Sequence, residues 1–195
     1  MLNPDQFWLP YPVPALAKDQ RDFNPTGFWQ GPSWPAATTH VVEAFAAAAK
    51  SLDRSLLSQA GELLLRAARV HLRPRPDFYE RYHPIDGRPL NKFRDYMHSW
   101  WIDLIIQHAA GLMVRDDGSV VIDPLPMGLE YFELRGAPVR GKRIDVLWHK
   151  PREAGLSFKN PPNVRSGLVV RLDGKTVFYR AAFKPGDDPV RLDLR

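Results

Sequence analysis

The spacing of hydrophobic residues changes once along this chain, near Gly111, and that change limits what the chain can fold into. Up to about this point, apolar side chains recur every three to four residues over about 35–50, 53–71 and 98–113, which is the period of an amphipathic helix. After Gly111 they alternate with polar residues, which is the period of a half-buried strand. Helices should therefore come first and an antiparallel β unit last.

The first two helical segments carry recognisable start signals. Pro35 suits the first turn of a helix, and Asp53 suits the position that caps one. The link between the two segments is so short that the helices should be antiparallel neighbours. The third segment is apolar on nearly every side, so it needs more cover than three helices can supply.

Five segments of the second half predict strands, and Asp173-Gly174 between the last two is the strongest hairpin signal in the chain. The predicted strands are 120–122, 131–134, 143–148, 169–172 and 176–179. Two long segments, residues 1–34 and 77–97, show no period and are rich in proline and aromatic residues. Such loops are ordered by their aromatic content, and ordered loops of this length are usually functional.

Composition excludes several classes of protein. The 195 residues include no cysteine, so disulfides, thiolate catalysis and zinc sites built on cysteine are excluded. No apolar run approaches the roughly twenty residues that cross a bilayer, and Met1 is not followed by a pattern typical of a signal peptide. We therefore expect a cytoplasmic protein without a membrane partner.

The net charge of +5 is unevenly distributed. Residues 1–134 hold 13 Lys and Arg against 16 Asp and Glu, whereas residues 135–195 hold 14 against 6. A basic segment of this kind can bind nucleic acid or an acidic partner. Its basic residues are spread along alternating strands rather than gathered in one run, so we expect no nucleic-acid partner.

Several short motifs resemble those of one enzyme group. They are Pro10-Tyr11-Pro12-Val13-Pro14, Trp29-Gln30-Gly31-Pro32-Ser33-Trp34, Tyr79-Glu80-Arg81-Tyr82-His83-Pro84 with Asp86-Gly87, and Ser99-Trp100-Trp101-Ile102-Asp103-Leu104-Ile105. Over about residues 7–148 the chain resembles the C-terminal part of the helical-toroid glycoside hydrolases, which include trehalases, processing α-glucosidase I and mannosylglycerate-hydrolase-like enzymes. The resemblance implies an (α/α)6 toroid of six helical hairpins, with the sugar bound among loops at one end.

The expected fold class is therefore mainly α with a β tail. Residues 1–117 would form the C-terminal portion of a helical toroid, comprising its last hairpins and its substrate loops. Residues 118–195 would form a small antiparallel β unit. The chain would be a fragment, a truncated gene product or one half of a split enzyme, and the missing N-terminal half of the toroid would be its partner.

The resemblance implies an inverting mechanism. In such enzymes one carboxylic acid protonates the leaving oxygen, and a carboxylate roughly 6.5–9.5 Å away activates water. Glu80 matches the family's general base, and Tyr79 and Tyr82 could orient that carboxylate or its water. Without the family motif, Glu80 reads as a solvated acid paired with Arg81. Nothing in the chain matches the general acid, so we expect the chain to be inactive alone.

Aromatic and small residues of the same motifs are the candidates for contacts with a carbohydrate substrate. Indole faces can stack on a pyranose ring, and glycine lets the backbone approach a ligand closely. The alternative for the indoles is that they fill the core. Gln30 stands where the family often has Arg. The candidates are Trp8, Tyr11, Trp29, Gln30, Gly31, Trp34 and Tyr82.

We expect no cofactor and no metal, because no second pair of ligands accompanies His83 and His98. The most favoured function is hydrolysis of α-linked sugars as part of a larger glycoside hydrolase. The alternatives are a non-catalytic carbohydrate-binding or scaffold protein, and one half of a split enzyme.

Overall fold

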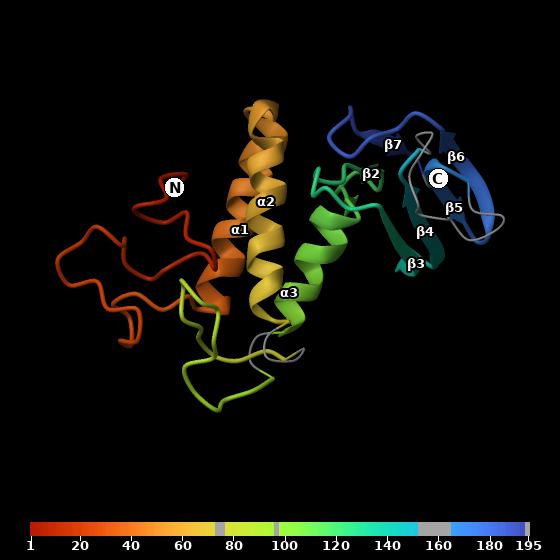
Figure 1. Ribbon diagram of the computed structural model, residues 1–195. Coiled ribbons are helices and arrows are strands. Elements are labelled where there is room, and N and C mark those ends of the chain that lie inside the picture. Colours follow the sequence, from red (N-terminus) through yellow and green to blue (C-terminus); the bar gives the residue numbers. More distant parts are fainter. Residues whose placement is uncertain (73–76, 96–97, 152–164, 194–195) are drawn as a thin grey trace. The chain divides into compact units, whose positions relative to one another are not determined.

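The computed structural model describes residues 1–72, 77–95, 98–151 and 165–193 (Figure 1). The chain divides into two compact units, Met1–Leu104 and Ile105–Arg195. This boundary falls earlier in the sequence than the expected division after residue 117. Each unit is described by itself.

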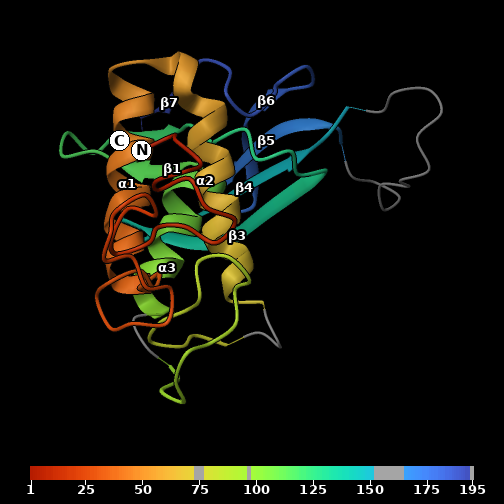
Figure 2. The ribbon, with the colours of Figure 1, turned by 60° about the vertical axis from the view of Figure 1, so that its left-hand side comes forward.

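An αα-hairpin forms the centre of the first unit. Helix α1 spans Pro35–Ser51, and a single 3-10 turn, η1 (Arg54–Leu56), leads into helix α2 (Leu57–Val70). The two helices lie side by side in Figures 1 and 2. Small residues on α1 allow close approach, since Ala46 and Ala49 are fully buried, as are Leu63 and Leu64 on α2. The predicted hairpin is confirmed.

Asp53 starts the second helical segment as predicted. Its carboxylate accepts hydrogen bonds from the backbone N–H of Ser55 at 3.0 Å and from the Ser55 hydroxyl at 2.7 Å. Its pKa is lowered chiefly by the hydrogen bond from the Ser55 side chain.

The third predicted helix is shorter than its apolar pattern suggested. Helix α3 spans His98–Leu104, and residues Ile105–Ala109 form a π-helical turn, η2, in which the N–H of Ala110 donates to the carbonyl of Ile105 at 2.9 Å. Gly111 follows with φ +77°, and a Cβ there would lie 2.2 Å from the backbone nitrogen of Pro124. Only glycine fits this reversal, so the helix cannot continue to residue 113.

Two antiparallel sheets make up most of the second unit. One has the strand order β1-β2-β7, from Leu112–Val114, Val120–Ile122 and Val190–Leu192. The other has the order β3-β4-β5-β6, from Tyr131–Val139, Lys142–His149, Gly167–Leu172 and Lys175–Arg180. Asp173 and Gly174 join β5 to β6 with φ values of +50° and +80°, which confirms the predicted hairpin.

One hydrophobic core cluster joins the strands of both sheets. It includes the fully buried Ile122, Val146, Leu168 and Phe183 together with Trp148. The indole N–H of Trp148 donates to the carbonyl of Phe183 at 3.0 Å. The core therefore lies on one face of the four-stranded sheet.

The expected fold class, mainly α as the end of an (α/α)6 toroid with a β tail, is wrong. The described residues contain three short helices and seven strands in two antiparallel sheets, so strands outnumber helices and this part of the chain is not the helical end of a toroid. The helical pattern past Leu104 becomes a π turn and then strand β1, and β7 adds a strand that the sequence did not predict. No helix among the described residues has the length and apolar character needed to span a membrane.

Candidate functional site

The two proline-rich and aromatic loops of the first unit are joined by backbone hydrogen bonds. Ser33 and Tyr82 each donate an N–H to the other's carbonyl at 2.9 Å, and the Tyr11 N–H donates to the carbonyl of Pro84 at 3.0 Å. The Ser33 hydroxyl donates to the carbonyl of Tyr11 at 2.6 Å. Both loops lie where α1 begins and α2 ends (Figures 1 and 2). The quoted motifs of residues 10–14, 29–34 and 79–84 are thus brought together.

Tyr82 is the buried anchor of the second loop. Its side chain is fully buried, and its hydroxyl accepts the Tyr79 N–H at 2.7 Å and donates to the carbonyl of Asp77 at 3.1 Å. The same hydroxyl lies 3.2 Å from Nδ1 of His71. Burial raises the pKa of Tyr82 to about 12. Tyr82 therefore holds residues 77–82 in place and has no exposed surface for a sugar.

His71 supports Tyr82 from the end of α2. Its ring is buried and packs against Phe78 and Trp101 at centroid distances of 4.5 and 5.0 Å. Burial lowers the pKa of His71 to about 4, although a backbone hydrogen bond at Asp77 acts in the opposite direction. The ring is therefore neutral at pH 7.

Glu80 lies two residues before this anchor and is half-buried. Its backbone N–H donates to the carbonyl of Phe93 at 3.2 Å, and its carboxylate accepts a hydrogen bond from the side-chain amide of Asn91. Because Glu80 is held both at its backbone N–H and at its carboxylate, the carboxylate points in a defined direction, which general-base catalysis requires. Asn91 is thus a site residue that the motifs did not reveal.

Arg81 faces the aromatic loop rather than Glu80. Its guanidinium stacks over the rings of Phe28 and Trp34 at 5.0 and 5.8 Å, and it donates to the carbonyl of Gly27 at 3.2 Å. No ion pair joins Glu80 to Arg81 in the part of the chain that the structure describes. The simple reading of Glu80 as a partner of Arg81 therefore has no support.

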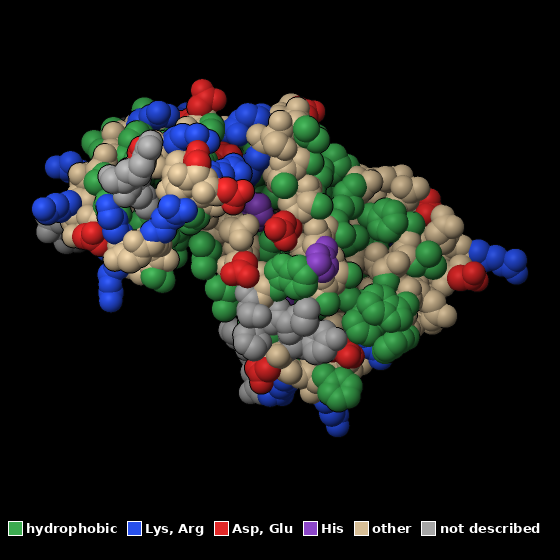
Figure 3. All heavy atoms as spheres, turned by 180° about the vertical axis from the view of Figure 1, so that it is seen from behind, with side chains coloured by type: hydrophobic (Ala, Val, Ile, Leu, Met, Phe, Trp, Pro, Cys, Tyr) green, Lys and Arg blue, Asp and Glu red, His purple; other side chains and the backbone are tan. Residues whose placement is uncertain are grey.

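Phe28, Trp29 and Trp34 form one aromatic cluster. The indoles of Trp29 and Trp34 stack at 4.1 Å with 8° between their planes, and Phe28 meets Trp34 edge-on at 4.9 Å. Trp34 is 3% exposed, whereas Trp29 is 53% and Phe28 is 56% exposed. Hydrophobic side chains at the surface of this unit appear in green in Figure 3. Trp34 therefore supports the cluster from inside, and Trp29 and Phe28 present its surface.

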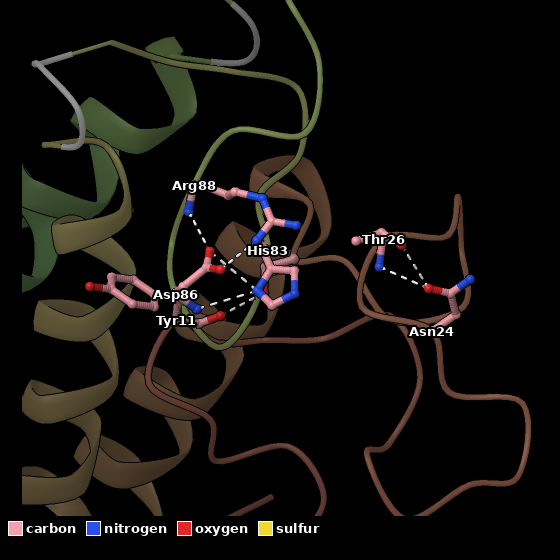
Figure 4. Close-up of polar contacts among 7 residues, drawn as sticks. Tyr11, Asn24, Thr26, His83, Asp86 and Arg88 are labelled. Carbon is pink, nitrogen blue, oxygen red and sulfur yellow. Dashed lines mark hydrogen bonds and ion pairs between the residues drawn. The ribbon is translucent and has the colours of Figure 1, made fainter.

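Asn24 shapes the segment that precedes this cluster. Its side-chain oxygen accepts hydrogen bonds from the N–H of Thr26 at 3.0 Å and from the Thr26 hydroxyl at 2.9 Å (Figure 4). Its backbone N–H donates to the carbonyl of Gln30 at 2.8 Å. A Cβ on Gly31 would lie 2.6 Å from the carbonyl oxygen of Asn24. Gly31 is thus required by contact within the loop, and Gln30 is exposed beside it.

Trp8 and Tyr11 have different neighbours. The guanidinium of Arg66 on α2 lies 4.8 Å from the centroid of the Trp8 ring and donates to the carbonyl of Leu9 at 3.1 Å. Tyr11 packs against the turn of the second loop, because a Cβ on Gly87 would lie 2.7 Å from its ring. The structure therefore attaches Trp8 to α2 and Tyr11 to the Glu80 loop.

A short polar network fixes the turn beside Tyr11 (Figure 4). Asp86 pairs with Nδ1 of His83 at 3.3 Å and with Arg88 at 2.5 Å, while Gly87 takes φ +75°. Burial lowers the pKa of His83, and Asp86 opposes this effect. The pKa of Asp86 is lowered overall, since the hydrogen bonds and charges of Arg88 and His83 outweigh desolvation. The described residues contain no group of three His, Asp or Glu side chains able to hold a metal ion.

Comparison with known protein families identifies the class of protein to which these loops and this site belong. Residues 1–99, just over half of the chain, match the model of a glycoside hydrolase domain. The chain belongs to that family, the mannosylglycerate hydrolase MGH1-like glycoside hydrolase domain. A search of the curated proteins found no match.

The matched range includes both loops and Glu80. It confirms the expected membership of a glycoside hydrolase family. It supports neither the trehalase and α-glucosidase I resemblance nor the placement of the chain at the C-terminal end of such an enzyme.

Proposed function

We propose that this chain takes part in the hydrolysis of an α-linked sugar with inversion at the anomeric carbon, with Glu80 as the general base. The observation that carries the proposal is the half-buried carboxylate of Glu80, held by Asn91 within the matched range. Glu80 would take a proton from a water molecule whose oxygen attacks the anomeric carbon as the bond to the leaving oxygen breaks. The leaving oxygen takes its proton from a separate general acid.

That acid is proposed to come from residues outside these 195, because no motif in the sequence matches it. The chain alone should then fail on ordinary disaccharides, whose leaving oxygen needs the acid. A substrate whose leaving group departs without a proton would still need the base. This difference separates the two carboxyl roles experimentally.

The seven candidate sugar-binding residues divide into three groups by burial in this proposal. Trp29 contacts the sugar through the indole face that Trp34 does not cover, and Gln30 is exposed beside it. Trp8 and Tyr11 are half-buried and border the loops. The remaining three residues are buried and would fix the shape of the loops without touching the sugar. They are Gly31, Trp34 and Tyr82.

The test is hydrolysis of α-glucosyl and α-mannosyl fluoride by the chain. The rate is measured as the release of fluoride ion. The unmodified chain should release fluoride above the buffer rate, and Glu80→Gln should lower this rate by about 10²-fold or more, the usual size of a general-base contribution. Glu43→Gln on α1 makes the same change of charge and should have no effect. Equal rates for Glu80→Gln and the unmodified chain would remove Glu80 from the mechanism.

A second candidate is carbohydrate binding without catalysis, which the exposed face of Trp29 favours. Here the chain would bind sugars, and Trp29→Ala would abolish binding. Fluoride release would stay at the buffer rate in every variant. The fluoride assay and the binding assay together therefore distinguish the two candidates.

A further inference from the structure

A cavity of about 260 Å³ lies on the four-stranded sheet of the second unit. Its lining alternates along the strands with core residues such as Val146, Trp148 and Val170, so the cavity is on the face opposite the core. All four strands contribute to the lining or flank it. The lining residues are Glu133, Arg135, Leu147, His149, Arg165, Val169, Arg171 and Thr176.

The charges of this lining are unbalanced, with three arginines against one carboxylate. Glu133 is already engaged, because it pairs with Arg135 at 2.8 Å and with Nε2 of His149 at 2.9 Å. Desolvation raises the pKa of Glu133, but the hydrogen bonds of His149 and Arg135 outweigh it and the pKa is lowered. The Glu133 carboxylate is therefore ionised at pH 7, and its single negative charge balances that of Arg135.

Arg165 and Arg171 have no carboxylate partner among the residues that the structure describes. Arg165 stacks over the ring of Tyr179 at 5.3 Å, a contact that uses the face of the guanidinium and not its N–H groups. Asp145 is directly opposite Arg171 in the sheet register, but its carboxylate accepts the N–H of Gly136 at 2.8 Å at the bulge of β3. Among the described residues, neither guanidinium therefore forms an ion pair with a carboxylate, although Asp145 lies on the strand beside Arg171.

His149 adds a further donor or acceptor at the same place. Its side chain is 3% exposed, it stacks on Tyr131 at 5.5 Å, and its Nε2 is fixed by Glu133. Nδ1 is buried and has no hydrogen-bond partner in the described part of the chain. A buried polar atom of this kind normally has a partner, because leaving it unpaired costs about 1–3 kcal/mol.

We propose that this cavity binds a small oxyanion, a phosphate or carboxylate group of a small molecule, between Arg165 and Arg171. A guanidinium presents two parallel N–H groups that match two oxygens of such an anion, and Thr176 offers a hydroxyl donor on the neighbouring strand. The cavity is too small for a folded partner or a nucleic-acid strand. Lys and Arg side chains spread over the second unit, as Figure 3 shows, attract anions toward it. The site lies outside the matched range, and it does not rest on the proposed function.

The test is isothermal titration calorimetry of the chain with inorganic phosphate and with acetate at low ionic strength, where charge interactions are strongest. Phosphate or acetate should bind with a dissociation constant on the order of 1 mM or tighter. The tighter of the two identifies the preferred oxyanion. Arg171→Gln and Arg165→Gln should each weaken this binding at least tenfold.

The matched control is Arg191→Gln, which removes the same charge from strand β7 of the other sheet, where Arg191 pairs with Asp117 at 3.6 Å. Circular dichroism confirms that each variant is folded. Equal weakening in Arg191→Gln and Arg171→Gln would overturn the site, since general charge attraction would then explain binding. Absence of binding of both anions, or binding of the polyanion heparin alone, would also overturn it.

Discussion

Replacing Tyr82 with phenylalanine removes one hydroxyl from the buried centre of the Glu80 loop. That hydroxyl accepts the Tyr79 N–H, donates to the carbonyl of Asp77 and lies 3.2 Å from Nδ1 of His71, so all three groups lose a partner. A buried group left unpaired costs about 1–3 kcal/mol. Tyr79 is buried and Asp77 is half-buried, so we expect the free energy of unfolding to fall by about 2–4 kcal/mol, a large part of the 5–15 kcal/mol typical of a domain.

Urea denaturation followed by tryptophan fluorescence measures this loss, because five of the six tryptophans, all but Trp148, lie in the first unit. Tyr79→Phe is the matched control. Its hydroxyl makes no hydrogen bond to any described residue, so its removal should change stability by less than about 0.5 kcal/mol. Equal effects of the two substitutions, or a loss below about 0.5 kcal/mol in Tyr82→Phe, would refute the reasoning.

The difference in the free energy of unfolding between Tyr82→Phe and the unmodified chain should decrease at high pH. Because the folded-state pKa of Tyr82 is raised to about 12, the unfolded chain loses this proton near pH 10 while the folded chain keeps it. The stabilisation is therefore complete below pH 10 and is lost between pH 10 and 12. The two-unit shift corresponds to about 2–3 kcal/mol, so the difference between Tyr82→Phe and the unmodified chain should shrink over that range.

Three further changes test the site from other directions. His71, with a pKa lowered to about 4, binds its proton more readily when unfolded, so stability should fall as pH drops from 6.5 to 4, and His71→Gln should remove much of this fall in urea titrations. Gly31→Ala should destabilise the first unit by about 1–3 kcal/mol in urea, since the new Cβ meets the Asn24 backbone, and unchanged stability would contradict that contact. Asn91→Ala should lower fluoride release about tenfold while sugar binding measured by calorimetry is retained, because Asn91 only positions Glu80; loss of both together would indicate a collapsed loop.

Local patterns predicted the elements well where one period continued over many residues. The α1–α2 hairpin, the cap at Asp53 and the Asp173-Gly174 turn are as expected, because each depends on neighbouring residues. Strand β1 was missed because its first residues were assigned to the end of the third helix, and β7 because Val190–Leu192 shows no period of its own; pairing with β2 fixes both. The predicted helix was extended too far, to residue 113, because the close approach of Gly111 to Pro124 brings together residues that are distant in sequence.

The sequence predicted the candidate site only in part, because contacts between residues distant in sequence also shape it. The motifs placed Glu80, Trp29 and Tyr82 in two loops, and the structure joins those loops through Ser33 and Tyr82. No pattern distinguished the exposed Trp29 from the buried Trp34, because the difference arises from packing. Asn91 carried no signal beyond its place in the same loop, eleven residues after Glu80.

The stereochemistry of the first product tests the central claim most directly. Proton NMR of α-glycosyl fluoride hydrolysis by the unmodified chain, recorded before mutarotation, should show the β-anomer of the sugar appearing first, because Glu80 directs water to the face opposite the leaving fluoride. The same spectra of Glu80→Gln should show only the slow spontaneous reaction. An α-anomer appearing first, or a β-anomer formed equally fast without the Glu80 carboxylate, would contradict the account.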